Sequence, residues 1–148
     1  MSIGMIGRVA LLAALLALPA TQALADGVGL IKVSKGTVFI ERKGKRLPAP
    51  VGTIVDSSDI LRTGRDGSAG ITFLDNSRMA LGPGSTLAID RFDFDSTTHE
   101  GHFDSTLRRG TLSAVSGKLA KHSPQAMTVR TRSTILAVRG TEFLVRTR

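Results

Sequence analysis

The sequence predicts an all-β protein: a single antiparallel β-sandwich or roll of short strands, preceded by an N-terminal signal peptide. Three observations predict this class. Apolar residues after residue 26 recur mostly at every second position, which is the period of a half-buried strand. Turn residues separate these runs at intervals of about eight to twelve residues. No stretch in this part of the sequence repeats its apolar residues at the period of about 3.6 that is typical of an amphipathic helix.

Residues 1–25 have the pattern of a signal peptide, and residues 26–148 that of one modest domain. Arg8 gives a positive start, and residues 9–18 are apolar without interruption. Ala23 and Ala25 place small side chains at the two positions that a signal peptidase reads. We therefore predict cleavage at the end of this segment. The alternative, a retained membrane anchor, is disfavoured because the apolar run is shorter than the roughly 20 residues that a spanning helix needs.

Two strands are expected at the start of the domain, at residues 28–33 and 36–41. A basic turn at residues 42–46 follows them. Residues 47–50 contain two prolines, which lack the backbone donor that a central strand needs, so we expect an extended connector there. Residues 51–55 then lead into the segment that organises the chain.

This organising segment, residues 59–90, is expected to form a β-meander. Residues 69–74 alternate as a strand, and Asp75-Asn76 follows directly as a two-residue hairpin turn, because both residue types tolerate positive φ. The chain returns through a second strand, which the Gly-Pro-Gly of residues 82–84 ends. The strands expected after this hairpin are residues 86–90, 91–95, 102–108, 111–115, 126–132, 135–138 and 142–146.

Four connections separate these later strands. Residues 96–101 are expected to form a turn, and Arg109-Gly110 a second turn. Residues 116–125 are polar, contain glycine and proline, and are predicted to be a loop. Residues 139–141, Arg-Gly-Thr, are predicted to make a tight corner before the last strand.

Composition limits where the protein works and what it contacts. The chain has no cysteine, so an exported form must draw its stability from packing and sheet hydrogen bonds, which suits a bacterial periplasmic or secreted protein. Its formal net charge of +8 favours anionic lipid, envelope polymer or an acidic protein, or else serves solubility. Nucleic acid is disfavoured, because Tyr and Trp are absent and only Phe remains for base stacking.

The basic turn is the first candidate binding site. Arg42, Lys43, Lys45 and Arg46 surround one glycine, an arrangement that can hold an anionic group of a partner. The alternative is a solvated hairpin tip with no ligand. We carry both interpretations forward.

Two other strings resemble catalytic or metal sites without matching one. His99 and His102 are three residues apart, but the expected turn does not supply the helix of a His-Glu-x-x-His zinc site. Asp93 and Asp95 share a strand face about 6 to 7 Å apart, where carboxylates can do acid–base work, bind calcium or form a solvated edge. No Gly-x-Ser-x-Gly elbow or glycine-rich phosphate loop is present. The sequence therefore predicts no catalytic residue, no metal ligand and no cofactor.

Three short blocks, each weak alone, follow one another in the order of a known family. The first block runs from Ser58-Asp59-Ile60 through Thr63-Gly64 to the strand end Phe73-Leu74-Asp75-Asn76-Ser77. The second is residues 107–112, and the third runs from residues 129–131 to Val138-Arg139-Gly140-Thr141-Glu142-Phe143. In this order the blocks resemble the FecR-type domain, named for a periplasmic regulator of iron-citrate uptake. Ser58 and Asn76 stand where the family pattern has glycine, and Asn76 keeps the tolerance of positive φ.

The resemblance implies two kinds of residue. Those expected to build the fold are Asp59, Thr63, Gly64, Asp75, Asn76, Ser77, Gly140 and Thr141. Arg139 is a candidate for an exposed cation that holds a carboxylate partner, in addition to the four basic residues of the turn. The alternative for its segment is a purely structural corner, in which Gly140 permits the bend.

The resemblance also implies a function. In the full regulators a cytoplasmic segment controls an alternative sigma factor, and here a predicted signal peptide takes its place. We therefore expect an exported, non-catalytic binding or scaffold module, accessory to envelope signalling through contacts with a protein partner in the periplasm or envelope. The alternative is an envelope-attached protein that binds anionic lipid or polysaccharide by charge.

Overall fold

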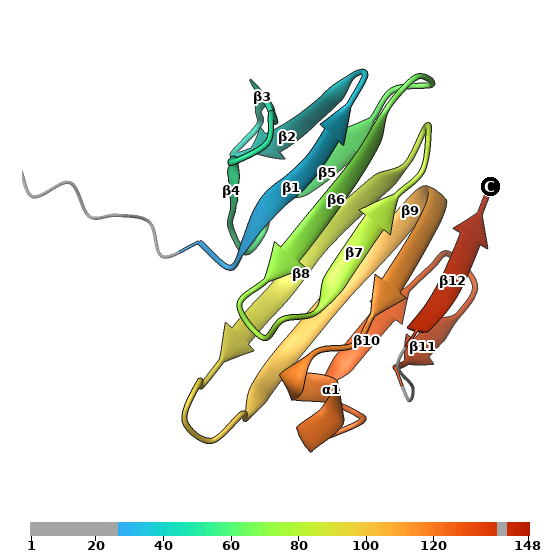
Figure 1. Ribbon diagram of the computed structural model, residues 1–148. Coiled ribbons are helices and arrows are strands. Elements are labelled where there is room, and N and C mark those ends of the chain that lie inside the picture. The colour runs from blue at the N-terminus through green and yellow to red at the C-terminus, as the bar shows by residue number, and fades with distance from the viewer. Residues whose placement is uncertain (1–26, 139–141) are drawn as a thin grey trace, which may run out of the picture.

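The computed structural model describes residues 27–138 and 142–148. These residues form one twelve-stranded sheet and a short helix, which confirms the predicted all-β class. Figure 1 shows the sheet curled over on itself, so that two layers of strands face each other. The predicted signal peptide and the predicted corner at residues 139–141 lie outside the described residues.

The strands are short except for two. In chain order the elements are β1 (Gly29–Lys35), β2 (Val38–Arg42), β3 (Lys45–Pro48), β4 (Ile54–Val55), β5 (Ile60–Thr63), β6 (Ser68–Phe73), β7 (Arg78–Leu81), β8 (Thr86–Phe94), β9 (Gly101–Val115), α1 (Lys118–His122), β10 (Met127–Arg130), β11 (Ile135–Ala137) and β12 (Glu142–Thr147). The two strands predicted at residues 86–95 are one strand, β8, with a register shift between Ile89 and Arg91.

The main path of the sheet runs β3-β2-β5-β8-β9-β7-β6-β1-β4. The strands β10 and β12 attach to β9 outside this path, and β11 pairs with β10. All of these pairs are antiparallel except one, because β10 runs parallel to β9. The predicted antiparallel arrangement holds for every pair except β9–β10. The β-meander predicted for residues 59–90 is wrong, because only β6 and β7 pair with each other as chain neighbours, whereas β5 pairs with β2 and β8, and β7 pairs with β6 and β9.

The longest strand, β9, joins the two layers. Its first part pairs with β8 and β10, and its last part, from Gly110 to Val115, pairs with β7 and β12. Leu107 and Leu112 are both fully buried, although residues five apart on a regular strand would face opposite sides of the sheet. The set of residues that faces the core therefore shifts by one position between them. The turn predicted at Arg109-Gly110 is wrong: the chain bends there without reversing, and Gly110 takes up the bend at φ +96°.

The core lies between the layers and centres on three phenylalanines. Phe73 comes from β6 in one layer, and Phe92 and Phe103 come from β8 and β9 in the other. Their ring centroids are 4.5 Å apart for Phe73 and Phe103, and 5.0 Å for Phe92 and Phe103. Aromatic pairs at such distances add to the stability gained from burial alone. The cluster therefore holds the curled sheet together.

The helix α1 lies where a loop was predicted, so that part of the prediction is wrong. Leu119 and Ala120 are its buried residues, and Gly117, directly before it, packs against the backbone of the β6–β7 turn. Packing of this kind stabilises a turn of helix that is too short to show a periodic apolar pattern. No helix in residues 27–138 and 142–148 has the length and apolar character needed to cross a membrane.

Candidate functional site: a basic hairpin held by a buried ion pair

The predicted basic turn is the tip of the β2–β3 hairpin. Arg42 pairs with Lys45 across the two strands, and Lys43 and Gly44 form the turn with φ values of +51° and +75°. Two consecutive residues of positive φ are the hairpin geometry that matches strand twist. Lys43, Lys45 and Arg46 are exposed, and the Arg46 guanidinium carbon lies 4.1 Å from the centre of the Phe39 ring. This cation–π contact fixes the direction of one charge at the tip.

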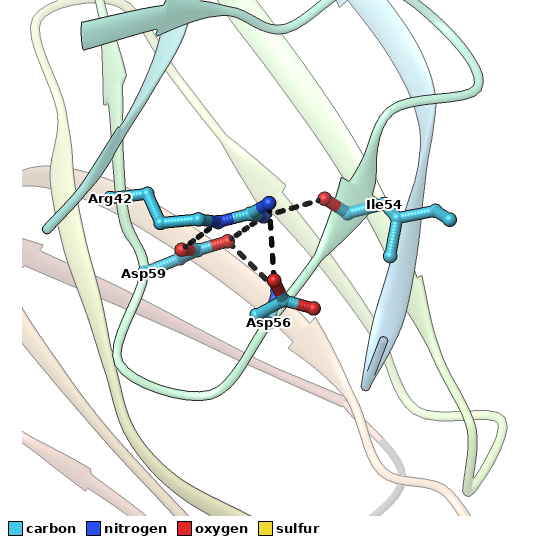
Figure 2. Close-up of polar contacts among 4 residues, drawn as sticks. All are labelled: Arg42, Ile54, Asp56 and Asp59. Atoms are coloured by element: carbon cyan, nitrogen blue, oxygen red, sulfur yellow. Dashed lines mark hydrogen bonds and ion pairs between the residues drawn. The ribbon is translucent and has the colours of Figure 1, made fainter. Parts of the chain in front are cut away.

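Arg42 points away from this tip, toward the carboxylates of Asp59 and Asp56 (Figure 2). Its Nε and Nη2 donate to the two oxygens of Asp59 at 2.8 and 2.6 Å, and Nη2 also donates to the Ile54 carbonyl at 3.0 Å. Nη1 lies 3.1 Å from Asp56 Oδ2. The backbone N–H of Asp56 donates to Asp59 at 2.8 Å. Bidentate pairing of this kind is the strongest that an arginine makes with a carboxylate.

This pairing explains why Asp59 belongs to the first sequence block. Its side chain is only 1% exposed, and a buried carboxylate requires a partner. The hydrogen bond to Asp59 raises the pKa of Arg42, partial burial opposes this, and the charges of Asp59 and Asp56 add to the increase. Arg42 is therefore a brace that joins β2 to the start of β5.

The structure thus divides the four basic residues that the sequence grouped together. Lys43, Lys45 and Arg46 face solvent, and none of them has an ion-pair partner within the described residues. The sequence singled out both Arg42 and Asp59 but did not predict their contact. A signal was available, since an aspartate that opens an apolar strand is rarely buried there without a partner.

Thr63 and Gly64, from the same block, hold the β7–β8 turn. The Thr63 hydroxyl donates to the Gly82 carbonyl at 2.7 Å and accepts from the Ser85 N–H at 2.9 Å. The Gly64 carbonyl accepts from the Gly84 N–H at 2.9 Å. Ser85 is also buried, and its hydroxyl accepts from the Thr111 N–H at 3.0 Å, which links this turn to β9.

Asp75, Asn76 and Ser77 lie in the β6–β7 turn, which spans four residues, 74–77, and not the two predicted. Asp75 Oδ1 accepts from the Ser77 N–H at 3.1 Å and from its hydroxyl at 2.5 Å, and both side chains are fully buried. The Asp75 carbonyl accepts from the Lys118 N–H at 2.7 Å, which ties α1 to the turn. Asn76 has φ +65°, the left-handed conformation expected for it. The turn therefore serves both the hairpin and the helix.

Replacing Asn76 with alanine is expected to destabilise the fold by about 1 kcal/mol, because alanine pays the cost of a left-handed backbone that asparagine tolerates. Asn76→Gly is the matched control and should leave the free energy of unfolding within about 0.5 kcal/mol of the parent, since glycine adopts this conformation freely. Urea titrations of the three proteins measure both values. Equal destabilisation by alanine and glycine would show that the asparagine side chain, and not the backbone, matters.

The acidic and histidine strings occupy the β8–β9 end of the sheet. Burial raises the pKa of Asp93, but the hydrogen bond and charge of Arg91 and those of His102 outweigh this, so the pKa of Asp93 is lowered. The backbone N–H groups of Thr98 and Thr97 lower the pKa of Asp95. Within the described residues, no group of three or more histidine, cysteine or acidic side chains is arranged to hold a metal ion.

The remaining predicted site residues, Arg139, Gly140 and Thr141, lie outside the described residues. The structure therefore brings Lys43, Lys45 and Arg46 together at one hairpin, with Arg42 behind them as a brace. What such a site can do is bind an anionic group in a partner. It offers three cations and one aromatic ring.

Comparison with known proteins gives one match. A family model described as FecR protein matches residues 59–148, a range that begins at the buried aspartate of the ion pair. The comparison with curated proteins and the comparison with solved structures each found no match.

Proposed function

The chain belongs to the FecR family, and on that premise we propose that it is an exported, non-catalytic module that binds a protein partner in the periplasm or the cell envelope. The observation that carries this proposal is the pair of surfaces open to a partner. One is the basic hairpin tip. The other is the free edges of the sheet, which offer backbone groups for strand pairing.

The hairpin tip is well suited to binding because it is braced. Three hydrogen bonds from Arg42, two to Asp59 and one to the Ile54 carbonyl, fix the end of β2, the strand that carries the tip. The backbone that carries the three exposed cations is therefore ordered before a partner arrives. A surface that is ordered in the free protein loses less conformational entropy on binding.

The first experiment reverses the charge of the tip. Lys43→Glu, Lys45→Glu and Arg46→Glu, introduced together, are expected to reduce recovery of the partner from periplasmic extract by about tenfold or more, because favourable contacts with acidic groups become repulsive. Quantitative mass spectrometry of the captured proteins measures this. Arg42 is kept, so that the hairpin stays braced.

A matched control separates the site from overall charge. Lys35→Glu, Lys118→Glu and Lys121→Glu change the net charge by the same amount at exposed positions on other elements. This control should recover the partner as the parent protein does. Equal loss in both triple variants would mean that net charge, and not the hairpin, governs capture.

A second candidate function rests on the same cations and on the formal net charge of +8. In it the protein attaches to anionic lipid or polysaccharide of the envelope by charge. Attachment of this kind is screened by salt over about 8 Å at physiological ionic strength. Release from phosphatidylglycerol vesicles by added salt would favour it, whereas a protein complex with a buried apolar centre is expected to survive the same wash.

A further inference from the structure

The outer edge of β12 has no strand partner among the described residues. Its inner edge pairs with β9 from Glu142 to Thr147 in an unbroken antiparallel register. In such a ladder, alternate peptide groups point away from the partner, so this edge presents unpaired N–H and C=O groups. Leu144 on this strand is 72% exposed, which is high for an apolar side chain on a short edge.

A groove of about 290 Å³ lies between β11 and β12. It is lined mostly by apolar side chains, among them Leu136, Phe143 and Val145. Leu136 and Phe143 pack against the core while remaining partly exposed, so the groove is the place where the interior of the curled sheet meets solvent. It runs beside the free edge of β12.

A second hollow, of about 430 Å³, lies beyond the ends of the same two strands. Four arginines line it: Arg109 from β9, Arg132 from the β10–β11 turn, and Arg146 and Arg148 at the end of the chain. No acidic residue is among its lining residues, and none of the four arginines has an ion-pair partner in the part of the chain that the structure describes. We call this hollow the arginine pocket.

The topology explains why these arginines meet. Because β11 runs antiparallel to β10, the turn that carries Arg132 lies where β10 ends. β10 is parallel to β9, and β12 is antiparallel to the last part of β9, beside the bend at Gly110. Figure 1 shows the end of β12 and the β10–β11 turn at the same end of the molecule. Four like charges around one hollow give it a positive potential, which favours an anionic group there.

We propose that an acidic, extended segment of a protein partner docks along β12. Its backbone pairs with the free edge, its apolar side chains enter the groove between β11 and β12, and its carboxylates bind in the arginine pocket. This inference rests on the proposed protein-binding function and names the chemistry of the partner. A small anion would fill the arginine pocket alone and leave the adjoining edge and groove unused, whereas an acidic strand uses all three.

The test uses fluorescence anisotropy with three labelled peptides and the full processed chain. The first peptide alternates valine and threonine and ends in a run of glutamates. The second has the same sequence with glutamines in place of the glutamates. The third has the sequence of the first, with every second backbone nitrogen methylated. We expect the first to bind at least about tenfold more tightly than either of the others, since each lacks one required interaction with the protein. Arg132→Ala with Arg146→Ala should weaken it by about tenfold, and the exposed pair Lys118→Ala with Lys121→Ala should not.

Four results would overturn the inference. Equal binding of the glutamate and glutamine peptides would show that the arginine pocket does not select for acid. Undiminished binding of the methylated peptide would exclude strand pairing. Full displacement of the first peptide by inorganic phosphate, or by glutamates without the apolar part, would reduce the site to an anion site. Recovery of a partner through the hairpin tip while the peptides fail would refute this inference and leave the proposed function standing.

Discussion

Gly110→Ala is expected to destabilise the protein by about 3 kcal/mol. Two costs combine at this residue. Its φ of +96° is unfavourable for any residue with a Cβ, at about 1 to 2 kcal/mol. A Cβ there would also lie 2.5 Å from the Ser85 Cα and 2.2 Å from the Ser85 hydroxyl oxygen, and overpacking of this kind costs about 1 to 3 kcal/mol. Thermal and urea unfolding measure the sum.

Ser85 cannot simply move aside, because its hydroxyl is bonded to the bend itself. It accepts from the Thr111 N–H at 3.0 Å and donates to the Thr111 carbonyl at 3.2 Å. Gly84→Ala is the matched control: it has a similar φ of +63°, but nothing lies within 4 Å of its Cβ position. We expect this control to lose only about 1 kcal/mol. If the two variants lost the same stability, the backbone conformation alone, and not close packing against Ser85, would explain the effect of Gly110→Ala.

Arg42→Met is expected to destabilise the protein by about 3 kcal/mol. The substitution removes both hydrogen bonds to Asp59, whose carboxylate remains buried with only the Asp56 N–H as a donor. Removing one partner of a buried ion pair usually costs about 3 to 5 kcal/mol. We take the lower end because the Arg42 side chain is 31% exposed and water can reach it. The free energy of unfolding in urea measures the effect.

Two further variants complete this prediction. Arg42→Met combined with Asp59→Leu removes both charges and should recover much of the loss, since a well-packed apolar pair often replaces a buried ion pair at little cost. Arg62→Met breaks the more exposed pair with Glu41, at 3.0 Å, and should cost less than about 1 kcal/mol. A loss in Arg42→Met no greater than that in Arg62→Met would mean that Arg42 is not a brace.

The β6–β7 hairpin could be predicted because its signals are local, whereas the partners of β5 and β8 depend on strands far away in the sequence, so the predicted meander was wrong. The alternation at residues 69–74 and the positive φ tolerated by Asn76 both act within one hairpin, and β6 and β7 pair as expected. The bend of β9 could not be predicted in the same way. Arg109-Gly110 has turn chemistry, and only pairing with strands far away in the sequence decides that the chain continues.

The candidate sites also differ in whether they depend on neighbouring residues or on distant strand pairings. Lys43, Lys45 and Arg46 are neighbours in the sequence. Turn chemistry and charge were therefore enough to predict that all three are exposed at one hairpin. The contact between Arg42 and Asp59 depends on the pairing of β2 with β5. The arginine pocket depends on one parallel and two antiparallel pairings at once, and no local pattern links its four members.

The most direct test of protein binding is photo-crosslinking in the cells from which the gene derives. A benzophenone amino acid replaces Lys43 at the hairpin tip, Leu144 at the free edge, or Thr97, an exposed control in the β8–β9 turn. We predict a discrete protein adduct from Lys43 or Leu144, the same partner wherever both react, and no such adduct from Thr97. Recovery of the chain without any adduct from Lys43 and Leu144 in its native envelope would contradict the account.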